Sequence, residues 1–175
     1  MNKMKRVIVI AITIPVSYVL QMIALPSIPH LIAVPNLLLA GVISFGFLYG
    51  RSIGLVTGVI SGLLLDFLGS GTPGFYTLIF ALLGYGDGFL SEKMESEIVV
   101  VLFGLLLVNE VLFHAYVFLF GFLIGKRFSL SPYLLSSALP EFLMTMIGFL
   151  IIYGILLFFS KRWDLKVNKG DVRIV

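Results

Sequence analysis

The hydrophobic positions of the chain form long apolar stretches, separated by short segments rich in charged residues, proline or glycine. The apolar stretches are residues 7–25, 31–49, 52–68, 75–90, 98–124 and 130–160. A polar tail at 161–175 follows the last of them. About 20 apolar residues in a helix cross the roughly 30 Å hydrocarbon core of a bilayer. The stretches do not alternate with a period of two, as strands of a membrane barrel would. The pattern predicts an all-α integral membrane protein, a single domain built as a bundle of six transmembrane helices.

Composition agrees with this class and excludes others. Hydrophobic residues make up 59% of the 175 residues and charged residues only 12%, with a mean hydropathy of +1.12. Soluble domains carry about 25% charged residues. The chain has no cysteine, so disulfides and thiolate-bound metals are excluded. No basic run is interleaved with aromatics, so no nucleic-acid partner is expected.

The positions of lysine and arginine predict the orientation in the membrane. With the N-terminus inside, the opposite side holds two basic residues, Lys126 and Arg127, and the cytoplasmic side holds ten: Lys3, Lys5, Arg6, Arg51, Lys93, Lys161, Arg162, Lys166, Lys169 and Arg173. Cytoplasmic loops carry such an excess. No small-residue cleavage site follows the first stretch, so it is expected to be a retained span. We expect a multi-pass protein of the bacterial cytoplasmic membrane with both termini in the cytoplasm.

A series of small residues marks the third stretch. Gly54, Gly58, Gly62 and Asp66 are spaced by four, which keeps them near one face of a helix. Small residues let a second helix approach closely in lipid. This face therefore packs against a neighbouring span or a partner helix, and packing within the chain is favoured. Asp66 is interpreted either as a helix-end carboxylate that binds turn N–H groups or the Thr72 hydroxyl, or as an acid that faces a partner protein or a ligand.

Ionisable residues within membrane helices are candidates for function. Glu110 and His114 share a helix face because they are four residues apart, and Glu141, like Glu110, is predicted near mid-depth of its span, so the three could meet. They form either a polar clasp between two helices, which is favoured, or a proton or cation relay or ligand pocket. Asp87 is predicted at the membrane interface. Two distant histidines make a weak metal site, and no catalytic set is recognised, so no metal, cofactor or enzymatic activity is expected.

An ordered set of residues resembles a known family. The set consists of Pro35, Asn36, Gly50, Gly54, Gly58, Gly62, Asp66, Gly74, Gly84, Tyr85 and Gly88. Its order resembles that of the bacterial rod shape-determining protein MreD family, mainly over residues 35–88. That family commonly has an acid after the proline, where this chain has Asn36. The last two stretches match only in hydrophobicity, so the resemblance assigns no role to Glu110, His114 or Glu141.

The resemblance implies a non-enzymatic membrane scaffold of the rod, or elongation, complex that controls cell shape and lateral peptidoglycan synthesis. Its implied partners are an MreC-like single-pass periplasmic protein, an MreB-like filament and the peptidoglycan glycosyltransferase–transpeptidase pair, and homo-oligomers are possible. The implied fold is similar to the substrate-binding (S) components of energy-coupling factor transporters. The alternative is therefore a small-molecule-binding subunit of such a transporter, although few polar residues occur in the last three stretches. A third hypothesis is a proton-coupled carrier or intramembrane enzyme that uses Glu110, His114 and Glu141.

Overall fold

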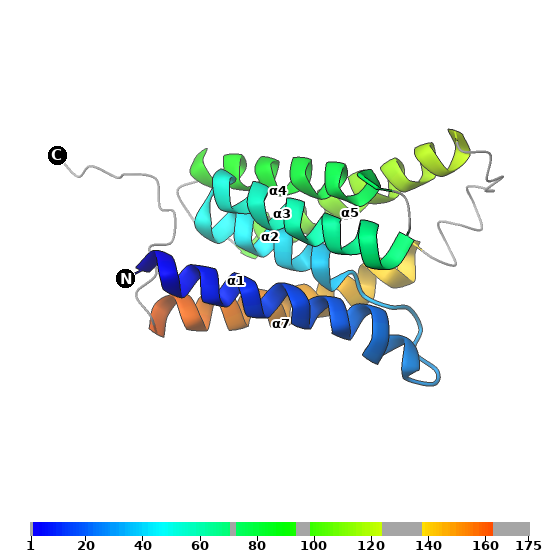
Figure 1. Ribbon diagram of the computed structural model, residues 1–175, viewed down its shortest axis with the longest axis horizontal. Coiled ribbons are helices and arrows are strands. Elements are labelled where there is room, and N and C mark those ends of the chain that lie inside the picture. The colour runs from blue at the N-terminus through cyan, green and yellow to red at the C-terminus, as the bar shows by residue number, and fades with distance from the viewer. Residues whose placement is uncertain (1, 71–72, 94–98, 124–137, 163–175) are drawn as a thin grey trace.

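The computed structural model describes residues 2–70, 73–93, 99–123 and 138–162. Every regular element in these ranges is a helix: α1 (Asn2–Val19), the π-helical turn η1 (Leu20–Ala24), the 3₁₀ turn η2 (Leu25–Ser27), α2 (Leu37–Tyr49), α3 (Arg51–Leu65), the π-helical turn η3 (Asp66–Ser70), α4 (Phe75–Lys93), α5 (Val99–Leu123) and α7 (Leu139–Arg162). The long helices run side by side, and α1 begins at the end of the bundle where α7 ends (Figure 1).

Several helices are suited to a membrane. Four described segments are long and apolar enough to cross a bilayer, namely Met4–Ser27, Arg51–Gly69, Val101–Phe120 and Leu139–Ser160. Large apolar side chains such as Val7, Ile12 and Phe158 are exposed on the outer faces, where lipid would cover them. The prediction of an all-helical membrane protein is confirmed, whereas the count of six spans remains a prediction.

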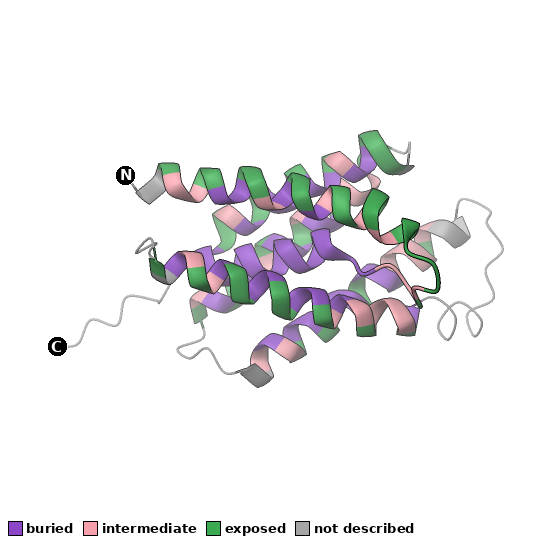
Figure 2. Cartoon of the chain, turned by 90° about the horizontal axis from the view of Figure 1, so that it is seen from below, coloured by how far each residue is buried: buried purple, intermediate pink, exposed green. Residues whose placement is uncertain are grey.

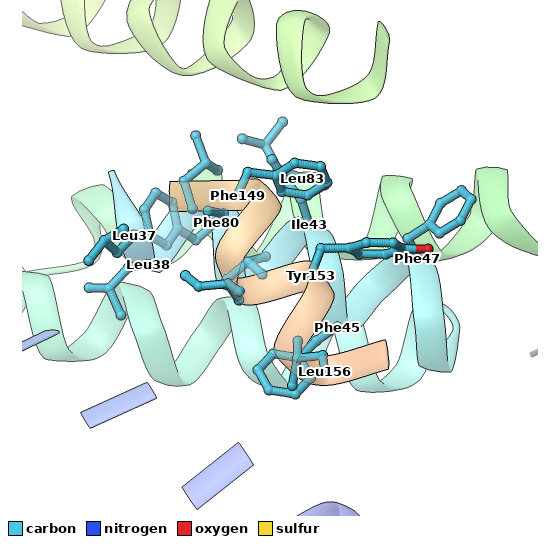
Figure 3. Packing of buried hydrophobic residues seen from close by; sticks show 14 of the residues in the cluster. Leu37, Leu38, Ile43, Phe45, Phe47, Phe80, Leu83, Phe149, Tyr153 and Leu156 are labelled. Atoms are coloured by element: carbon cyan, nitrogen blue, oxygen red, sulfur yellow. The ribbon is translucent and has the colours of Figure 1, made fainter. Parts of the chain in front are cut away.

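The short helix α2 forms the centre of the bundle. All 13 of its residues are buried, as the continuous purple helix in Figure 2 shows. A helix that is apolar on every side is expected in such a core. Its side chains pack against Phe80 and Leu83 of α4 and against Phe149, Tyr153 and Leu156 of α7 (Figure 3). At about 1.5 Å per residue, α2 spans only about 20 Å, less than the hydrocarbon thickness.

The start of α2 lies inside the protein and needs internal hydrogen-bond partners. The helix begins at Leu37, not at 31 as the apolar stretch suggested, and the segment 31–36 is not helical. The Asn36 side chain accepts a hydrogen bond from the backbone N–H of Leu39 (3.1 Å), and Gln21 Oε1 accepts one from Leu38 (3.0 Å). The N–H of Asn36 donates to Thr145 Oγ1 of α7 (2.9 Å). These contacts satisfy N–H groups that a helix leaves unpaired at its first turn.

The glycine face of α3 packs directly on the backbone of α4. A Cβ at Gly54 would lie 2.0 Å from the carbonyl oxygen of Gly84, and one at Gly58 would lie 2.2 Å from that of Phe80. At Gly62 the nearest atom would be the Cα of Thr77, at 2.3 Å. These distances are shorter than any non-bonded contact, so only glycine fits. The face is used within the chain and is not open to a partner helix.

The other end of the same interface depends on two further glycines. A Cβ at Gly88 of α4 would lie 2.2 Å from the backbone nitrogen of Arg51, the first residue of α3. Gly50, between α2 and α3, has a φ of +87°, a conformation that glycine adopts without the steric cost of a Cβ. Arg51 and Glu92 then form an exposed ion pair across this end of α3 and α4 (Nε to Oε2, 3.4 Å).

We predict that Gly58→Ala destabilises the protein because the added methyl group must separate two backbones. Forcing atoms into a packed interface costs about 1–3 kcal/mol, and we expect thermal unfolding in detergent to show a loss of about 2 kcal/mol or more. The matched control is Gly86→Ala in α4, since a Cβ at Gly86 has no atom within 4 Å. That variant should be neutral or more stable, because alanine favours helix. Equal unfolding temperatures for the two variants would contradict the backbone contact.

Candidate functional site

A cavity of about 330 Å³ lies at the end of the bundle opposite the start of α1. It is lined by Gln21, Met22, Asn36, Leu65, Gly69, Tyr76, Phe113, His114, Val117 and Glu141. These residues come from every long helix or from the turn next to it, so the cavity exists only in the assembled bundle. Its volume lies in the range of about 300–1,000 Å³ that is usual for small-molecule sites.

Irregular backbone creates the space for this cavity. Both π-helical turns contribute to the lining, Gln21 and Met22 from η1 and Gly69 from η3. π-Helical turns occur frequently at functional sites. The non-helical segment 31–36 ends at Asn36, which also lines the cavity. In a membrane protein, non-helical backbone is tolerated where it is buried in protein or lines a cavity. The irregular segments of the backbone therefore meet at the cavity.

One wall of the cavity is aromatic. The rings of Tyr76 and Phe113 are nearly parallel, with centroids 6.2 Å apart and an interplanar angle of 27°. Phe80 packs behind Phe113 at 5.8 Å. The hydroxyl of Tyr116 donates to the carbonyl of Phe75 (3.0 Å), which ties α5 to the start of α4. These contacts hold Tyr76 and Phe113 as a firm apolar surface.

A second wall carries two amide side chains. The amide oxygens of Gln21 and Asn36 already accept backbone hydrogen bonds from the first turn of α2. Their NH₂ groups are therefore the parts that can serve a ligand, and these groups are donors only. Capping α2 thus orients two hydrogen-bond donors toward the cavity.

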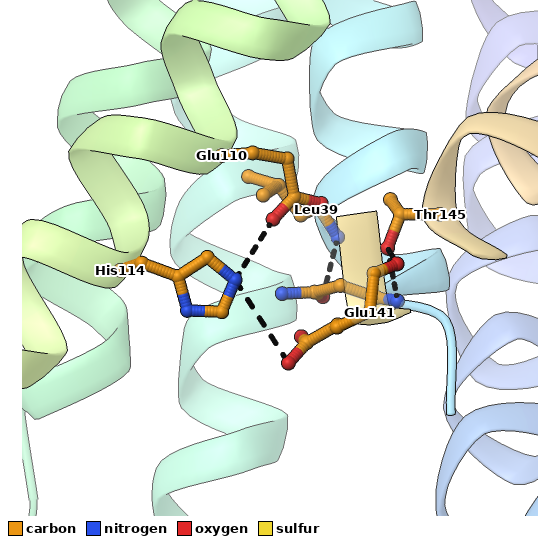
Figure 4. Close-up of polar contacts among 6 residues, drawn as sticks. Leu39, Glu110, His114, Glu141 and Thr145 are labelled. Carbon is orange, nitrogen blue, oxygen red and sulfur yellow. Dashed lines mark hydrogen bonds and ion pairs between the residues drawn. The ribbon is translucent and has the colours of Figure 1, made fainter. Parts of the chain in front are cut away.

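The third polar element is the group of Glu110, His114 and Glu141 (Figure 4). His114 Nε2 lies 3.3 Å from Glu110 Oε2 and 3.9 Å from Glu141 Oε2. Glu110 is only 2% exposed. Glu141 lies in the first turn of α7 as described, which begins at Leu139, and its depth in the membrane stays a prediction. The three residues do meet, and they join α5 to α7 at the cavity wall.

Asp66 caps the start of α4 and is not aimed at a ligand. Its carboxylate accepts hydrogen bonds from the backbone N–H groups of Gly74 (2.9 Å), Tyr76 (2.7 Å) and Thr77 (3.1 Å), and from the Thr77 hydroxyl. Of the two interpretations from sequence, this is the helix-end carboxylate that binds N–H groups. Thr72 lies outside the described residues. A carboxylate at a helix N-terminus also interacts favourably with the helix dipole.

Asp87 was expected at the membrane interface and is instead buried. It is 3% exposed, and its Oδ1 accepts a hydrogen bond from Asn109 Nδ2 of α5 (2.8 Å). The neighbouring Gly84 and Gly88 pack within the α3–α4 contact, which draws this part of α4 into the bundle. Asp87 is thus part of the contact between α4 and α5.

The remaining residues of the ordered set do not gather at one site. Pro35 is buried before α2, Gly74 adopts a positive φ in the turn before α4, and Tyr85 is exposed on the outer side of α4. Of the ordered set, only Asn36 lines the cavity. The set therefore describes how the helices turn and pack, and does not define a binding site.

Sequence reasoning missed several cavity residues, in particular Gln21, Met22, Tyr76 and Val117. Gln21 offered one signal, since it is the only amide side chain in the first apolar stretch. Tyr76 and Val117 offered none, because an aromatic or aliphatic residue in a membrane helix is ordinary.

The fold and the cavity define a helical membrane protein with a cavity between its helices. The chain matches the ECF-type riboflavin transporter S component family over residues 1–164, and it belongs to that family. A search of curated proteins and a search of solved structures each give no match. The family and the apolar helices support a multi-pass protein of the inner membrane. Members of the family are transporter subunits and not enzymes.

The family match overturns the resemblance to the MreD family. The function in cell shape and peptidoglycan synthesis is wrong with it, as are the MreC-like, MreB-like and peptidoglycan-synthase partners. The error has a physical cause. Glycines spaced by four specify close helix packing, which unrelated membrane proteins share. The alternative of a transporter subunit agrees with the family. The few polar residues in the last three stretches were a poor argument against it, because the polar residues that line the cavity come from separate helices.

We predict that Asp66→Ala destabilises the protein by at least about 2 kcal/mol, since three backbone N–H groups and one hydroxyl lose a charged acceptor. Asp66→Asn should lose less, because its amide keeps one acceptor oxygen. In detergent, the unfolding temperature should be highest for the wild type, lower for the Asn variant and lowest for the Ala variant. An alanine variant as stable as the wild type would contradict the capping role.

Proposed function

We propose that this chain is the substrate-binding subunit of an energy-coupling factor transporter and that it binds riboflavin in the described cavity. The observation that carries the proposal is the cavity itself, with its aromatic wall and its amide donors, in a chain of this family.

The lining suits the chemistry of riboflavin. The vitamin joins a flat aromatic ring system, which has a polar imide edge, to a chain of hydroxyl groups. Tyr76 and Phe113 offer an aromatic surface, but their 6.2 Å separation leaves no room for a third ring between them, because stacked atoms need about 3.5 Å on each side. The ring system would therefore pack against this wall. The amides of Gln21 and Asn36 can donate to imide oxygens, and Glu141 can accept from N–H or hydroxyl groups.

The charge of the cavity favours an uncharged ligand. Glu141 lines it and Glu110 lies behind, while the described lysine and arginine residues lie at the opposite end of the bundle, on the first turns of α1 and α3 and the last turns of α4 and α7. With no cation bound beside the cavity, a phosphate ester of the vitamin would bring negative charge toward two carboxyl groups. We therefore expect discrimination in favour of riboflavin over its phosphate.

The direction of uptake fits the predicted orientation. If six helices span the membrane with both termini in the cytoplasm, the cavity opens at the outer side, where a scarce vitamin is captured. The cytoplasmic end of the bundle would then face the ATPase and T components with which S components assemble. We expect the chain to have no catalytic activity of its own.

We predict that the purified protein quenches riboflavin fluorescence on binding and that Tyr76→Leu weakens binding about tenfold or more. Removing an aromatic partner costs about 0.5–1.5 kcal/mol beyond the lost area, and 1.4 kcal/mol is a factor of ten in affinity. The matched control is Phe158→Leu, since Phe158 is exposed on α7 away from the cavity. Its affinity should be unchanged, and riboflavin phosphate should bind the wild type, freed of metal with a chelator, at least about tenfold more weakly. The absence of riboflavin binding would refute the proposal.

Two single-cysteine variants test the predicted orientation, since the natural chain contains no cysteine that would also react. Ser27 and Ser52 are both exposed and lie at opposite ends of the bundle. In intact cells a membrane-impermeant maleimide should label Ser27→Cys, and it should label Ser52→Cys only after the membrane is opened. The reverse pattern would show that the cavity faces the cytoplasm.

A further inference from the structure

Glu110 is a buried acid next to the cavity that no step of vitamin binding contacts directly. The side chain is 2% exposed, does not line the cavity, and has no hydrogen-bond partner for Oε1 among the described residues. Its other oxygen, Oε2, faces His114 Nε2 at 3.3 Å. A buried carboxylate oxygen without a hydrogen-bond partner is costly in a membrane. The position of Glu110 thus calls for a positively charged group close to it.

The neighbouring residues complete a set of three metal ligands. One oxygen of Glu110, one nitrogen of His114 and one oxygen of Glu141 all lie within 4.8 Å of one another. Ligand atoms at about 2.1 Å from a tetrahedral ion are roughly 3.4 Å apart. The separation of Glu110 and His114, 3.3 Å, already fits, and that of Glu141 and His114, 3.9 Å, is slightly long. Glu141 is 27% exposed in its side chain, so a small rotation can close the remaining gap.

The surroundings provide access and a further ligand. His114 and Glu141 line the cavity, so an ion can enter from it, and a water there can occupy the fourth position. The Thr145 hydroxyl donates to the backbone carbonyl of Glu141 (2.8 Å) and accepts from Asn36, which holds the first turn of α7 in place. One carboxylate from each of two helices and a shared imidazole would then fix α5 against α7.

We propose that Glu110, His114 and Glu141 bind a divalent transition-metal ion, for which Zn²⁺ is the probe. Imidazole suits Zn²⁺ and similar ions, while carboxylates alone would suit Mg²⁺ or Ca²⁺. A divalent cation also balances the two carboxylates, which one imidazole cannot do. The two distant histidines of the sequence gave no reason to expect this site, because one histidine with two glutamates from separate helices forms it. The inference does not depend on riboflavin binding.

The test uses the full chain, purified without a histidine tag and freed of metal with a chelator. Isothermal titration with Zn²⁺ and metal analysis after dialysis should show about one ion per chain. Glu110→Gln and His114→Gln should each weaken binding at least about tenfold, because each removes one of three ligands. Glu92→Gln is the matched control, since Glu92 pairs with Arg51 away from the cavity, and it should bind Zn²⁺ like the wild type. Mg²⁺ should not compete.

A second measurement keeps the test decisive if Glu110→Gln or His114→Gln does not fold. Glu141→Gln changes the more exposed ligand, and Zn²⁺ should raise the unfolding temperature of the wild type but not of this variant. Substoichiometric binding by the wild type, or equal binding by the wild type and the ligand variants, would overturn the proposal. Riboflavin binding without Zn²⁺ binding would refute only this inference, and the opposite result would refute only the proposed function.

Discussion

The structure depends on direct backbone contact between α3 and α4. Lipid does not drive helices together, so association in a membrane depends on close packing and polar contacts. At Gly58 and Gly62 the two backbones approach so closely that no side chain fits between them. The same two helices are joined at one end by the four hydrogen bonds to Asp66 and at the other by the ion pair of Arg51. The joined helices α3 and α4 pack together against one side of the short helix α2.

Burying α2 completely is what makes room for a cavity. A 13-residue helix leaves part of the membrane thickness unfilled along its axis. The remaining length is taken by the segment 31–36, whose last residues cannot use lipid as a hydrogen-bond partner. Thr145 of α7 accepts from the N–H of Asn36, and Gln21 of η1 accepts from the N–H of Leu38 in the first turn of α2. The space beside this segment becomes the cavity, so the cavity is a consequence of how a short helix is accommodated in a bilayer.

Much of the fold could be predicted from sequence because its causes are local. Apolar length predicts membrane helices, and glycines at every fourth position indicate a face for close packing, whose partner proved to be α4. The start of α2 was less predictable, because residues 31–36 are as apolar as a helix and only Pro35 and Asn36 indicate the break. The cavity could not be predicted, since its lining is brought together by contacts between segments far apart in the chain. Tyr76 and Phe113, for example, are separated by 37 positions (113 − 76) and meet at 6.2 Å.

The function was predicted wrongly from the same residues that allowed the helical membrane fold to be predicted correctly. Residues that determine helix packing are regularly spaced and therefore easy to recognise, whereas residues that determine the ligand are scattered and chemically ordinary. Proteins with different functions can share the first set, because the same bilayer imposes the same packing problem on each. The difference between a scaffold and a vitamin-binding subunit then lies in whether the end of the bundle opposite the start of α1 is filled or hollow. In this chain two π-helical turns and a non-helical segment leave it hollow, and side chains such as His114 and Glu141 give that hollow its chemistry.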